Sequence, residues 1–474
     1  MSIRIRFGNV WAWADGLTPG RLEDALDQAL SYPVQGAEWS LLHEAGIWDG
    51  RKHLLRRKDC RFPTGLLMHA VGTLRAIGIE PVLIDERGYP PGRRDDVPEF
   101  FVHPPGGKPW RPYQQAAIDE ALLVGRGVVV APPRAGKTLV GAAIVGTLGR
   151  KTLWVAPTNA IVDQTARVLR GQFGDEHVGV VGAGDRDTGR RFTVSTAAGA
   201  AALPKEWLAD VEALMLDEFH HSSAPSIQQI ARNCPRAFYR FGMTGTHFRI
   251  DGRDMEMHAI AANELVRISV GDLVRDGYLA PALIFMQSIA HKVRAKPTEA
   301  RKIGVVHHAE RNAAIVHWVR KLCGLGRKVV VLVEQIDHGK ALSGWLPAGT
   351  EFARSGRADF TSGQIDRFTA GEVPVLVGTS ILGEGVDLPR ADALVFARSG
   401  KAATTVWQSI FRVLTAYPGK ERAVIVDFSD EHQRLLRAWA QERRRLYASE
   451  PSFDLRDVPP LEAASYAHPS LPLS

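Results

Sequence analysis

Short runs of apolar and β-branched residues recur along most of this chain, separated by stretches with the spacing of amphipathic helices. Three runs come first, GVVVAP, TLWVAP and ALMLDE, and later ones are KVVVLVE, VPVLVGTS, DALVFAR and RAVIVDF. Strands that are buried on both faces have this composition, and their alternation with helices is typical of parallel sheets covered on both faces. There are enough such strands for two sheets, so the pattern predicts an α/β protein with two parallel-sheet lobes.

The length of 474 residues is too great for one typical core, and the sequence pattern changes at several points. Strand and helix periodicities near the start predict a small α+β domain, in which Thr18 caps the first helix. The segment ERGYPPGRRDDVPEFFVHPPGGKP is typical of a linker. The expected parts are a small N-terminal domain with its linker (1–103), a first lobe (104–275), a second lobe (276–448) and a flexible tail (449–474).

Composition limits the class of protein. The chain is 45% hydrophobic and 23% charged, as soluble globular proteins are, and its formal net charge of +7 suits an acidic partner such as nucleic acid. The charged N-terminus is not typical of a signal peptide, and no apolar run reaches the ~20 residues that span a bilayer. The widely spaced Cys60, Cys234 and Cys323 favour neither a zinc site nor a disulfide framework. We therefore expect no membrane segment, no metal cluster and a reducing cytoplasmic location.

A phosphate-binding pattern follows the first buried run. APPRAGKT (131–138) matches G-x-x-x-x-G-K-[ST], except that Ala131 stands at the first Gly. Backbone N–H groups at a helix start can hold phosphate oxygens, Lys137 can neutralise the outer phosphates, and the Thr138 hydroxyl can hold Mg²⁺. The alternative is an ordinary strand-to-helix turn, but strand, turn, Lys-Thr and helix occur together here. ATP and Mg²⁺ are thus expected cofactors, with the loop residues Pro133, Arg134, Ala135, Gly136, Lys137 and Thr138 as their site.

A second acidic site is predicted in LMLDEFHH (214–221). An apolar strand delivers Asp217 and Glu218 at its carboxyl end, where open α/β sheets bind ligands. Asp217 is suited to the Mg²⁺ shell, Glu218 to orienting the attacking water, and His220 to linking nucleotide state to the next motif. Asp-Glu after a strand is common and often lies in a solvated loop. Its position 80 residues after Lys137 makes the functional interpretation more specific.

The order of these motifs resembles that of superfamily 2 helicases, over about residues 110–430. That resemblance implies two RecA-like lobes with ATP in the cleft between them. In the first lobe, RPYQQAAID (111–119) resembles the element that reads adenine, and APTNAIVDQT and VSTAAG resemble segments that contact the nucleic-acid backbone. MTGT resembles the motif that couples ATP hydrolysis to movement. In the second lobe, GTSILGEGVDLP resembles the motif that joins the nucleic-acid contact to the nucleotide. The residues implied are Tyr113, Gln114, Gly385 and Asp387 for ATP, Thr244 and Thr246 for coupling, and Pro157, Thr158, Ser195, Thr196 and Thr379 for DNA.

The N-terminal segment WDGRKHLLRRKDCRFPTGLL (48–67) narrows the resemblance to phage UvsW-type recombination helicases, as do EQIDHGKAL and LVRDGYLA. Such proteins act on forks, displacement loops and four-way junctions. The resemblance therefore implies an ATP-dependent helicase or translocase for branched DNA, both double- and single-stranded, acting as a monomer in a bacterial or phage-infected cell. An RNA helicase is a further alternative, which the N-terminal likeness and the missing DEAD-type signature disfavour.

A basic run in the same segment supports a DNA role independently. Six Lys or Arg lie between residues 51 and 61 against one acid, Asp59, and Trp48 and Phe62 flank them. Cations can bind phosphates and aromatic rings can stack on opened bases. The alternative is a solvated basic strand beside core aromatics. The residues predicted to bind DNA here are Trp48, Arg51, Lys52, Arg56, Arg57 and Lys58.

WQSIFRVLT (407–415) departs from the form Q-x-x-G-R-x-x-R that such helicases carry in the second lobe. Gln408 and Arg412 match and are predicted to act in catalysis. Thr415 stands where the last Arg belongs, and an arginine finger can be worth ~10³–10⁵ in rate. Phe411 stands where the Gly belongs, and we expect its ring to push the lobes apart or to change the side-chain packing where the lobes meet.

These two departures leave several alternatives open. Arg398, Arg422 or Arg412 can take the place of the missing finger. The helix can shift so that Phe411 fills a pocket. A third alternative is that ATP turnover is inherently slow, which would make the chain an ATP-gated protein that binds DNA junctions with weak or no unwinding. The retention of the Lys-Thr and Asp-Glu pairs favours a working ATPase.

Overall fold

A computed structural model of the chain describes residues 3–88, 100, 102–104, 107–182, 184–219, 225–245, 254–353, 358–379, 388 and 390–462. The chain divides into two compact units, Met1–Ile268 and Ser269–Ser474. The predicted border between the lobes, 275/276, stays a prediction, and the division between the two compact units falls seven residues earlier. Helix α11 (Val270–Arg275) falls in the second unit, where Ala280 N then donates to Leu414 O. Most of the expected linker lies outside the described residues.

The first unit begins with a four-stranded sheet in the order β5-β2-β1-β6, in which only the β1–β6 pair is parallel. Helix α1 begins at Arg21 after Gly20 (φ 130°), so the predicted cap at Thr18 is wrong: the chain reaches helical geometry only after this glycine. The elements are β1 (Arg4–Phe7), β2 (Trp11–Asp15), α1 (Arg21–Ala29), β5 (Arg61–Pro63), α3 (Leu67–Ala76) and β6 (Val82–Asp85).

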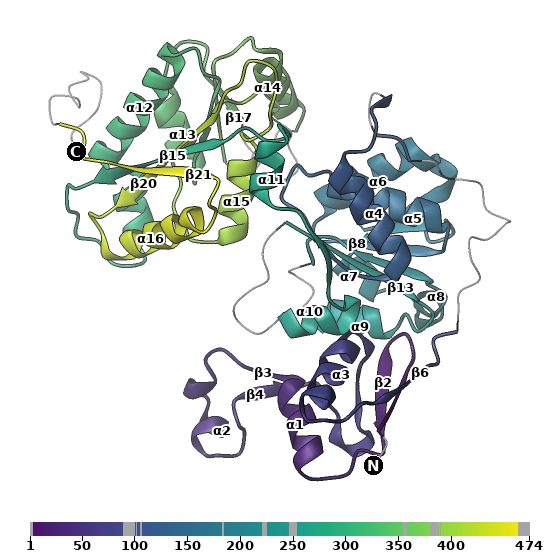
Figure 1. Cartoon of the computed structure of the whole chain (residues 1–474). Helices are drawn as coiled ribbons and strands as arrows, with labels where there is room; N and C mark the ends of the chain where they lie inside the picture. The colour runs from purple at the N-terminus through teal and green to yellow at the C-terminus, as the bar shows by residue number, and fades with distance from the viewer. Residues whose placement is uncertain are drawn as a thin grey trace. The chain divides into compact units, whose positions relative to one another are not determined.

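An arm leaves this small sheet between α1 and β5 (Figure 1). Its stem is the antiparallel pair β3 (Ser31–Pro33) and β4 (Arg51–His53), and α2 (Leu41–Glu44) lies between the two strands in the sequence. Side-chain hydrogen bonds hold the stem. The Trp48 Nε1–H donates to Arg51 O over 2.7 Å, and the Arg51 Nε–H donates to Ser31 Oγ over 2.9 Å.

An eight-stranded sheet forms the rest of the first unit, in the order β10-β9-β11-β8-β12-β13-β7-β14. All neighbours except β10–β9 are parallel. Its strands are β7 (Arg126–Val130), β8 (Thr152–Ala156), β9 (Val178–Gly182), β10 (Asp185–Arg186), β11 (Phe192–Thr196), β12 (Ala213–Leu216), β13 (Tyr239–Thr244) and β14 (Glu264–Arg267). Its helices are α4 (Pro112–Val124), α5 (Lys137–Leu148), α6 (Asn159–Phe173), α7 (Ala197–Ala201), α8 (Lys205–Ala209), α9 (Pro225–Arg232) and α10 (Asp254–Ala261).

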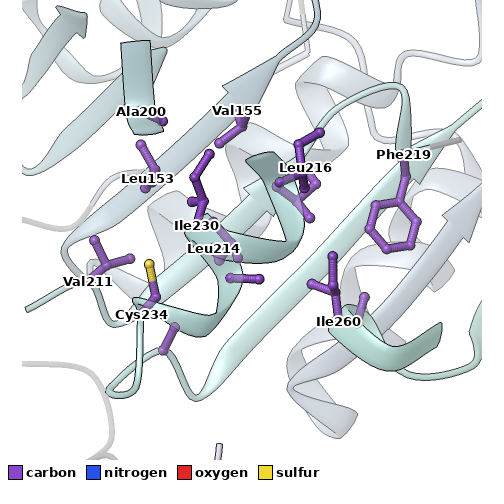
Figure 2. Packing of buried hydrophobic residues seen from close by; sticks show 14 of the residues in the cluster. Leu153, Val155, Ala200, Val211, Leu214, Leu216, Phe219, Ile230, Cys234 and Ile260 are labelled. Carbon is purple, nitrogen blue, oxygen red and sulfur yellow. The ribbon is translucent and has the colours of Figure 1, made fainter. Parts of the chain in front are cut away.

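The core of this sheet holds β12 firmly, and this strand positions the acidic pair. Leu214 and Leu216 on β12 lie in one cluster with Leu153 and Val155 of β8 and with Ile230 of α9 (Figure 2). Each of these side chains is almost fully buried. The burial of such aliphatic side chains contributes roughly 1.5–3 kcal/mol apiece. The strand therefore ends at a fixed point, where the two acids follow.

The second unit contains a seven-stranded sheet, all parallel, in the order β17-β18-β16-β19-β20-β15-β21. Its strands are β15 (Ala282–Ile289), β16 (Val329–Leu332), β17 (Glu351–Ala353), β18 (Val375–Gly378), β19 (Ala393–Phe396), β20 (Ala423–Asp430) and β21 (Phe453–Val458). Its other helices are a π-helix (Lys302–Val306), α12 (Ala309–Gly324), α13 (Ile336–Ser343), α14 (Ala358–Ala370), α15 (Ala403–Phe411) and α16 (Arg434–Ala448). The predicted α/β fold, two parallel-sheet lobes after a small α+β part, is confirmed.

The prediction of a flexible tail from residue 449 is wrong for its first part. β21 (Phe453–Val458) pairs with β15 along six residues, from Ala282–Phe453 to Gln287–Val458, and forms the edge of the sheet. Gln287 Nε2 also donates to Pro459 O over 2.7 Å. The remaining tail, 463–474, lies outside the described residues. Among the helices that are described, none has the length and apolarity needed to cross a membrane.

Candidate functional site

The phosphate-binding loop joins β7 to α5, and its backbone explains which residues the sequence can vary. Ala131 N donates to Thr244 O over 2.9 Å, so Ala131 continues the pairing of β7 with β13 and needs no glycine. Gly136 is different, because its φ is +83° and an added Cβ would lie 2.5 Å from Gln114 Nε2. Arg134 also has a positive φ, 74°. The loop thus turns sharply into α5, whose first N–H groups are an anion site.

Lys137 is the first residue of α5, and its amine lies over the loop. Lys137 Nζ donates to Ala131 O over 3.1 Å and more weakly to Pro132 O over 3.5 Å. Gly245 lies beside this amine, since a Cβ there would be 3.1 Å from Lys137 Nζ. A flexible ammonium held only by main-chain oxygens can turn to a phosphate. Thr138 follows in the first turn of α5.

Helix α4 supports the loop from the side. Gln114 Nε2 donates to Ala135 O over 3.0 Å, and Tyr113 OH donates to the same oxygen over 3.1 Å. Gln114 Oε1 accepts from Arg111 N over 3.2 Å. Both predicted adenine-reading residues therefore contact the phosphate-binding loop. Their contact with a base stays a prediction.

Asp217 and Glu218 follow β12 at the same edge of the sheet. Burial and the neighbouring Glu218 charge raise the pKa of Asp217 to about 6, while Lys137 acts in the opposite direction. Asp217 Oδ1 accepts from Glu218 N over 2.9 Å, and Glu218 has a positive φ of 43°. A half-buried carboxylate whose pKa is raised in this way suits a divalent cation. Asp217 and Thr138 therefore fit the Mg²⁺ site expected from the sequence.

The predicted coupling residues are only partly described. Thr244 ends β13, fully buried, beside the loop that its main-chain oxygen contacts. His220 and Thr246 lie outside the described residues, as do Gly385 and Asp387 of the second unit.

The residues predicted to contact DNA from the first lobe lie at strand ends. Thr158, which follows Pro157, caps α6 by accepting from Ile161 N over 3.4 Å, and Thr196 caps α7 by accepting from Gly199 N over 3.1 Å. Ser195 is fully buried, and its hydroxyl donates to Val181 O over 2.8 Å. A direct contact from Ser195 is not possible in this conformation, so its prediction is corrected to support of the loop that carries Thr196.

In the second unit, Gln408 lies near the end of α15 and Arg412 follows as its C-cap residue. Arg412 is 8% exposed. Thr379 follows β18 and is 6% exposed, and its hydroxyl has no hydrogen-bond partner within the described residues.

Phe411 points into the interior of the second unit. It is 2% exposed, and its ring lies 5.5 Å from that of Trp407, which is also 5.5 Å from Phe453 of β21. The large ring at the expected glycine position is therefore accommodated as part of a buried aromatic group. This matches the alternative in which Phe411 fills a pocket.

Thr415 forms a β-bridge with Leu279. Its carbonyl accepts from Lys420 Nζ over 3.1 Å, and the same amine donates to Ala391 O over 2.7 Å and to Val413 O. Lys420 is 9% exposed and bonded to three carbonyls, so this cation is not placed to act as a finger.

The basic run near the N-terminus is largely paired within the protein. Arg57 contacts three carboxylates, at 2.7 Å from Asp24, 2.7 Å from Asp27 and 3.4 Å from Glu23. Lys52 pairs with Glu256, and Arg56 with Asp59 at 3.2 Å. In the described structure, Arg51 and Lys58 are the members of the run without an ion pair, and Arg51 instead donates to Ser31 O over 2.8 Å and to Ser31 Oγ over 2.9 Å. The run is thus not a free cationic face.

Sequence reasoning missed the exposed apolar residues of the arm. Trp39 is 85% exposed, Leu41 80%, Ile47 75% and Leu42 55%. They lie within nine residues of one another, on an arm whose stem is hydrogen-bonded. Apolar patches of this kind mark interaction sites. The sequence signal was the run AEWSLLHEAGIW, in which large apolar residues occur without a helical or strand-like period.

Two family descriptions match the chain. Residues 107–249 match the res subunit of type III restriction enzymes, and residues 354–416 match the conserved C-terminal domain of helicases. These segments contain the phosphate-binding loop, the acidic pair and the motif around Arg412. The matches and the two parallel sheets support an ATP-dependent enzyme with the domains of helicases, similar to those of superfamily 2.

Comparison with three individual proteins shows more narrowly what the chain is similar to. The chain is similar to the ATP-dependent DNA helicase UvsW of Enterobacteria phage T4, at 23% identity over 84% of this chain and 85% of that protein. It is also 27% identical to the DNA 3'-5' helicase XPB of Mycobacterium tuberculosis over 60% of this chain, although it spans only 54% of that relative. A fragment assigned to the HsdR subunit of a Vibrio vulnificus type I restriction enzyme shares the fold, with a TM-score of 0.58, 19% identity and coverage of 87% and 76%. These findings confirm the resemblance to superfamily 2 helicases of the UvsW type that the sequence motifs predicted.

Proposed function

We propose that this protein is an ATP-driven DNA helicase or translocase that remodels branched DNA such as forks, displacement loops and four-way junctions. The observation that carries the ATP-dependent part of the proposal is that the loop after β7, with Lys137 at the start of α5, and Asp217 after β12 leave the parallel sheet at the same edge, with only β13 between the two strands. Similarity over most of the chain to UvsW, a DNA helicase, supports DNA as the substrate, and action as a monomer is part of the proposal.

Each of the predicted site residues of the first unit has its own role in ATP hydrolysis. Lys137 and the N–H groups that begin α5 bind the outer phosphates, and Gln114 and Tyr113 keep the loop in shape. Mg²⁺, when bound by Thr138 and Asp217, supplies charge that stabilises the transferring phosphoryl group. Glu218 orients the attacking water. Gln408 and Arg412 of the second unit stay predicted catalytic residues.

The exposed arm supports action at a branch. Because most of the basic run is paired, the arm offers DNA an apolar tip rather than added charge. Apolar side chains that insert between bases unstack them and open the duplex. Replacing Trp39 and Leu42 by Ser should reduce unwinding of a fork and leave binding to a linear duplex unchanged. The matched control is the Met68→Ser and Leu123→Ser pair, since both side chains are also exposed, at 54% and 82%.

Thr415 favours a second candidate function. With this short neutral side chain at the finger position and Lys420 already bonded to main-chain oxygens, the chain is also suited to be an ATP-gated binder of DNA junctions with little unwinding. Both functions require ATP binding and differ in turnover.

The site assignment is tested by Lys137→Ala beside Lys151→Ala, a matched lysine of the same unit whose amine lies 4.0 Å from Asp210. We expect Lys137→Ala to abolish ATP hydrolysis and to spare binding to a DNA fork, whereas Lys151→Ala keeps both. Equal turnover in the two variants would refute the assignment. An RNA fork of the same sequence, used as competitor, separates DNA from RNA as substrate.

A further inference from the structure

A pocket of 580 Å³ lies in the second unit beyond the carboxyl ends of two neighbouring strands. Its lining comes from residues 293–299, which follow β15, and from residues 432–434, which follow β20. Because β15 and β20 pair in parallel over eight residues, both segments leave the sheet at the same edge. The pocket is therefore built on rigid strands.

Its lining carries an excess of positive charge. Arg294, Lys296 and Arg434 line it, against the single carboxylate of Glu299. None of the three cations forms an ion pair or a side-chain hydrogen bond within the described residues, unlike most arginines of this unit. Unpaired cations that converge on one cavity are an electrostatic site for an anion.

The end of a helix at the pocket also favours an anion. Gln433 caps the 15-residue helix α16 by accepting from Leu435 N and Leu436 N, so the positive end of this helix opens at the pocket. His432, which is 3% exposed, also lines the pocket, and its Nε2–H donates to Gly304 O over 2.8 Å. Burial lowers the pKa of this ring, so His432 adds no positive charge and the three cations carry the site.

The pocket is remote from the motif predicted to meet ATP. Thr415 bridges Leu279, which precedes the start of β15 at Ala282, so the end of that motif lies at the amino edge of the sheet. The pocket lies at the carboxyl edge, as does Thr379 after β18. β18 and β20 are three strand positions apart in the sheet order, or roughly 14 Å at ~4.8 Å per strand.

We propose that this pocket binds a phosphate of the DNA backbone and extends the strand contact that begins at Thr379. The proposal rests on the DNA-remodelling function proposed above and adds a second contact that the helicase motifs do not include. Arg294, Lys296 and Arg434 neutralise the phosphate, and the N-terminus of α16 adds its partial charge. Glu299 limits the net charge of the pocket, which keeps the contact reversible during movement along a strand.

The test is a triple variant, Arg294→Gln, Lys296→Gln and Arg434→Gln, in the full chain. The control triple, Arg275→Gln, Lys340→Gln and Arg445→Gln, removes the same charge from the same unit. Each control side chain is exposed and pairs with a carboxylate three residues away, namely Asp272, Asp337 and Glu442. Binding to a fluorescent DNA fork is measured from 50 to 300 mM salt, and thermal melting checks that both triples fold.

The pocket triple should bind DNA about tenfold more weakly at low salt, and its plot of log K against log salt should be shallower by about one, because ~0.9 counterion is released per phosphate contact. Equal slopes for the two triples would overturn the proposal. Inorganic phosphate at matched ionic strength is a second arm. If it displaces DNA from the unmodified protein but not from the pocket triple, phosphate and DNA compete for the pocket, as the proposal expects. If calorimetry shows phosphate binding that needs the three cations while DNA binding is unaffected, the site takes a free anion and the strand contact is refuted. If the unmodified protein does not bind the fork, the proposed function itself fails.

Discussion

The side-chain amide of Gln114 donates a hydrogen bond to the main-chain oxygen of Ala135 over 3.0 Å, which ties α4 to the phosphate-binding loop. The same amide fills the space beside Gly136 where a Cβ would stand. The aromatic-Gln element thus shapes the loop in addition to any contact with adenine.

Gln114→Leu should weaken ATP binding about tenfold, because it leaves the buried Ala135 oxygen and the Arg111 N–H with fewer hydrogen-bond partners. A buried polar group that loses its partner costs ~1–3 kcal/mol. Titration with a fluorescent ATP analogue measures the effect. Gln115→Leu is the matched control on the same helix, because Gln115 is exposed and bonds only Asp119. Similar affinities for the two variants would mean that α4 does not shape the loop.

Asp217→Asn should stabilise the protein in the absence of nucleotide and Mg²⁺, while abolishing hydrolysis. The folded-state pKa of about 6 lies above the ordinary value of 3.8, so the folded state resists the charged form. This penalty is absent below pH ~4, develops between pH ~4 and ~6, and is complete above. The gain in melting temperature should be a few degrees at pH 8 and shrink toward pH 5. Asp163→Asn, at an exposed helical carboxylate, should show no such trend. A loss of stability in Asp217→Asn at pH 8 would contradict the account.

Phe411→Gly restores the usual helicase residue, yet it should destabilise the second unit by ~3–5 kcal/mol. The ring is buried against Trp407, and its removal leaves a cavity in the core. Urea unfolding followed by tryptophan fluorescence measures this change. An unchanged unfolding midpoint together with faster ATP turnover would mean that Phe411 obstructs the motor instead of filling its core.

Arg57→Gln and Lys58→Gln should behave differently although they are adjacent. Arg57→Gln leaves the buried Asp27 and Glu23 without their cation and should lower the melting temperature by several degrees. Lys58→Gln should leave melting unchanged. Calorimetry distinguishes them. If neither variant changes melting and both weaken fork binding equally, the run acts as the cationic face that the sequence suggested.

The comparison of these two residues illustrates what the sequence could not reveal. A basic run is visible in one stretch, but the acids that neutralise it come from α1, about 30 positions earlier, and from Glu256, far along the chain. Only the fold brings such groups together. The phosphate-binding loop and the acidic pair were predictable because each lies within a few residues of a buried strand.

Other differences between the sequence predictions and the structure have local causes. β21 was missed because an edge strand with alternating half-exposed residues, FDLRDV, carries little apolar signal among prolines. The pocket at residues 293–299 and 432–434 was missed because its two halves follow strands that are neighbours in the sheet and distant in the sequence. Ser195 was assigned to DNA by motif, although its position at the end of a buried strand turns it inward.

The most direct test of the central claim is ATP turnover with and without forked DNA, measured together for the unmodified protein, Thr415→Arg and Lys137→Ala. The account of a DNA-remodelling motor predicts turnover that the fork stimulates in the unmodified protein, none in Lys137→Ala, and little further gain from Thr415→Arg. Barely detectable turnover that Thr415→Arg restores would contradict it, and the ATP-gated junction binder would then be the better description.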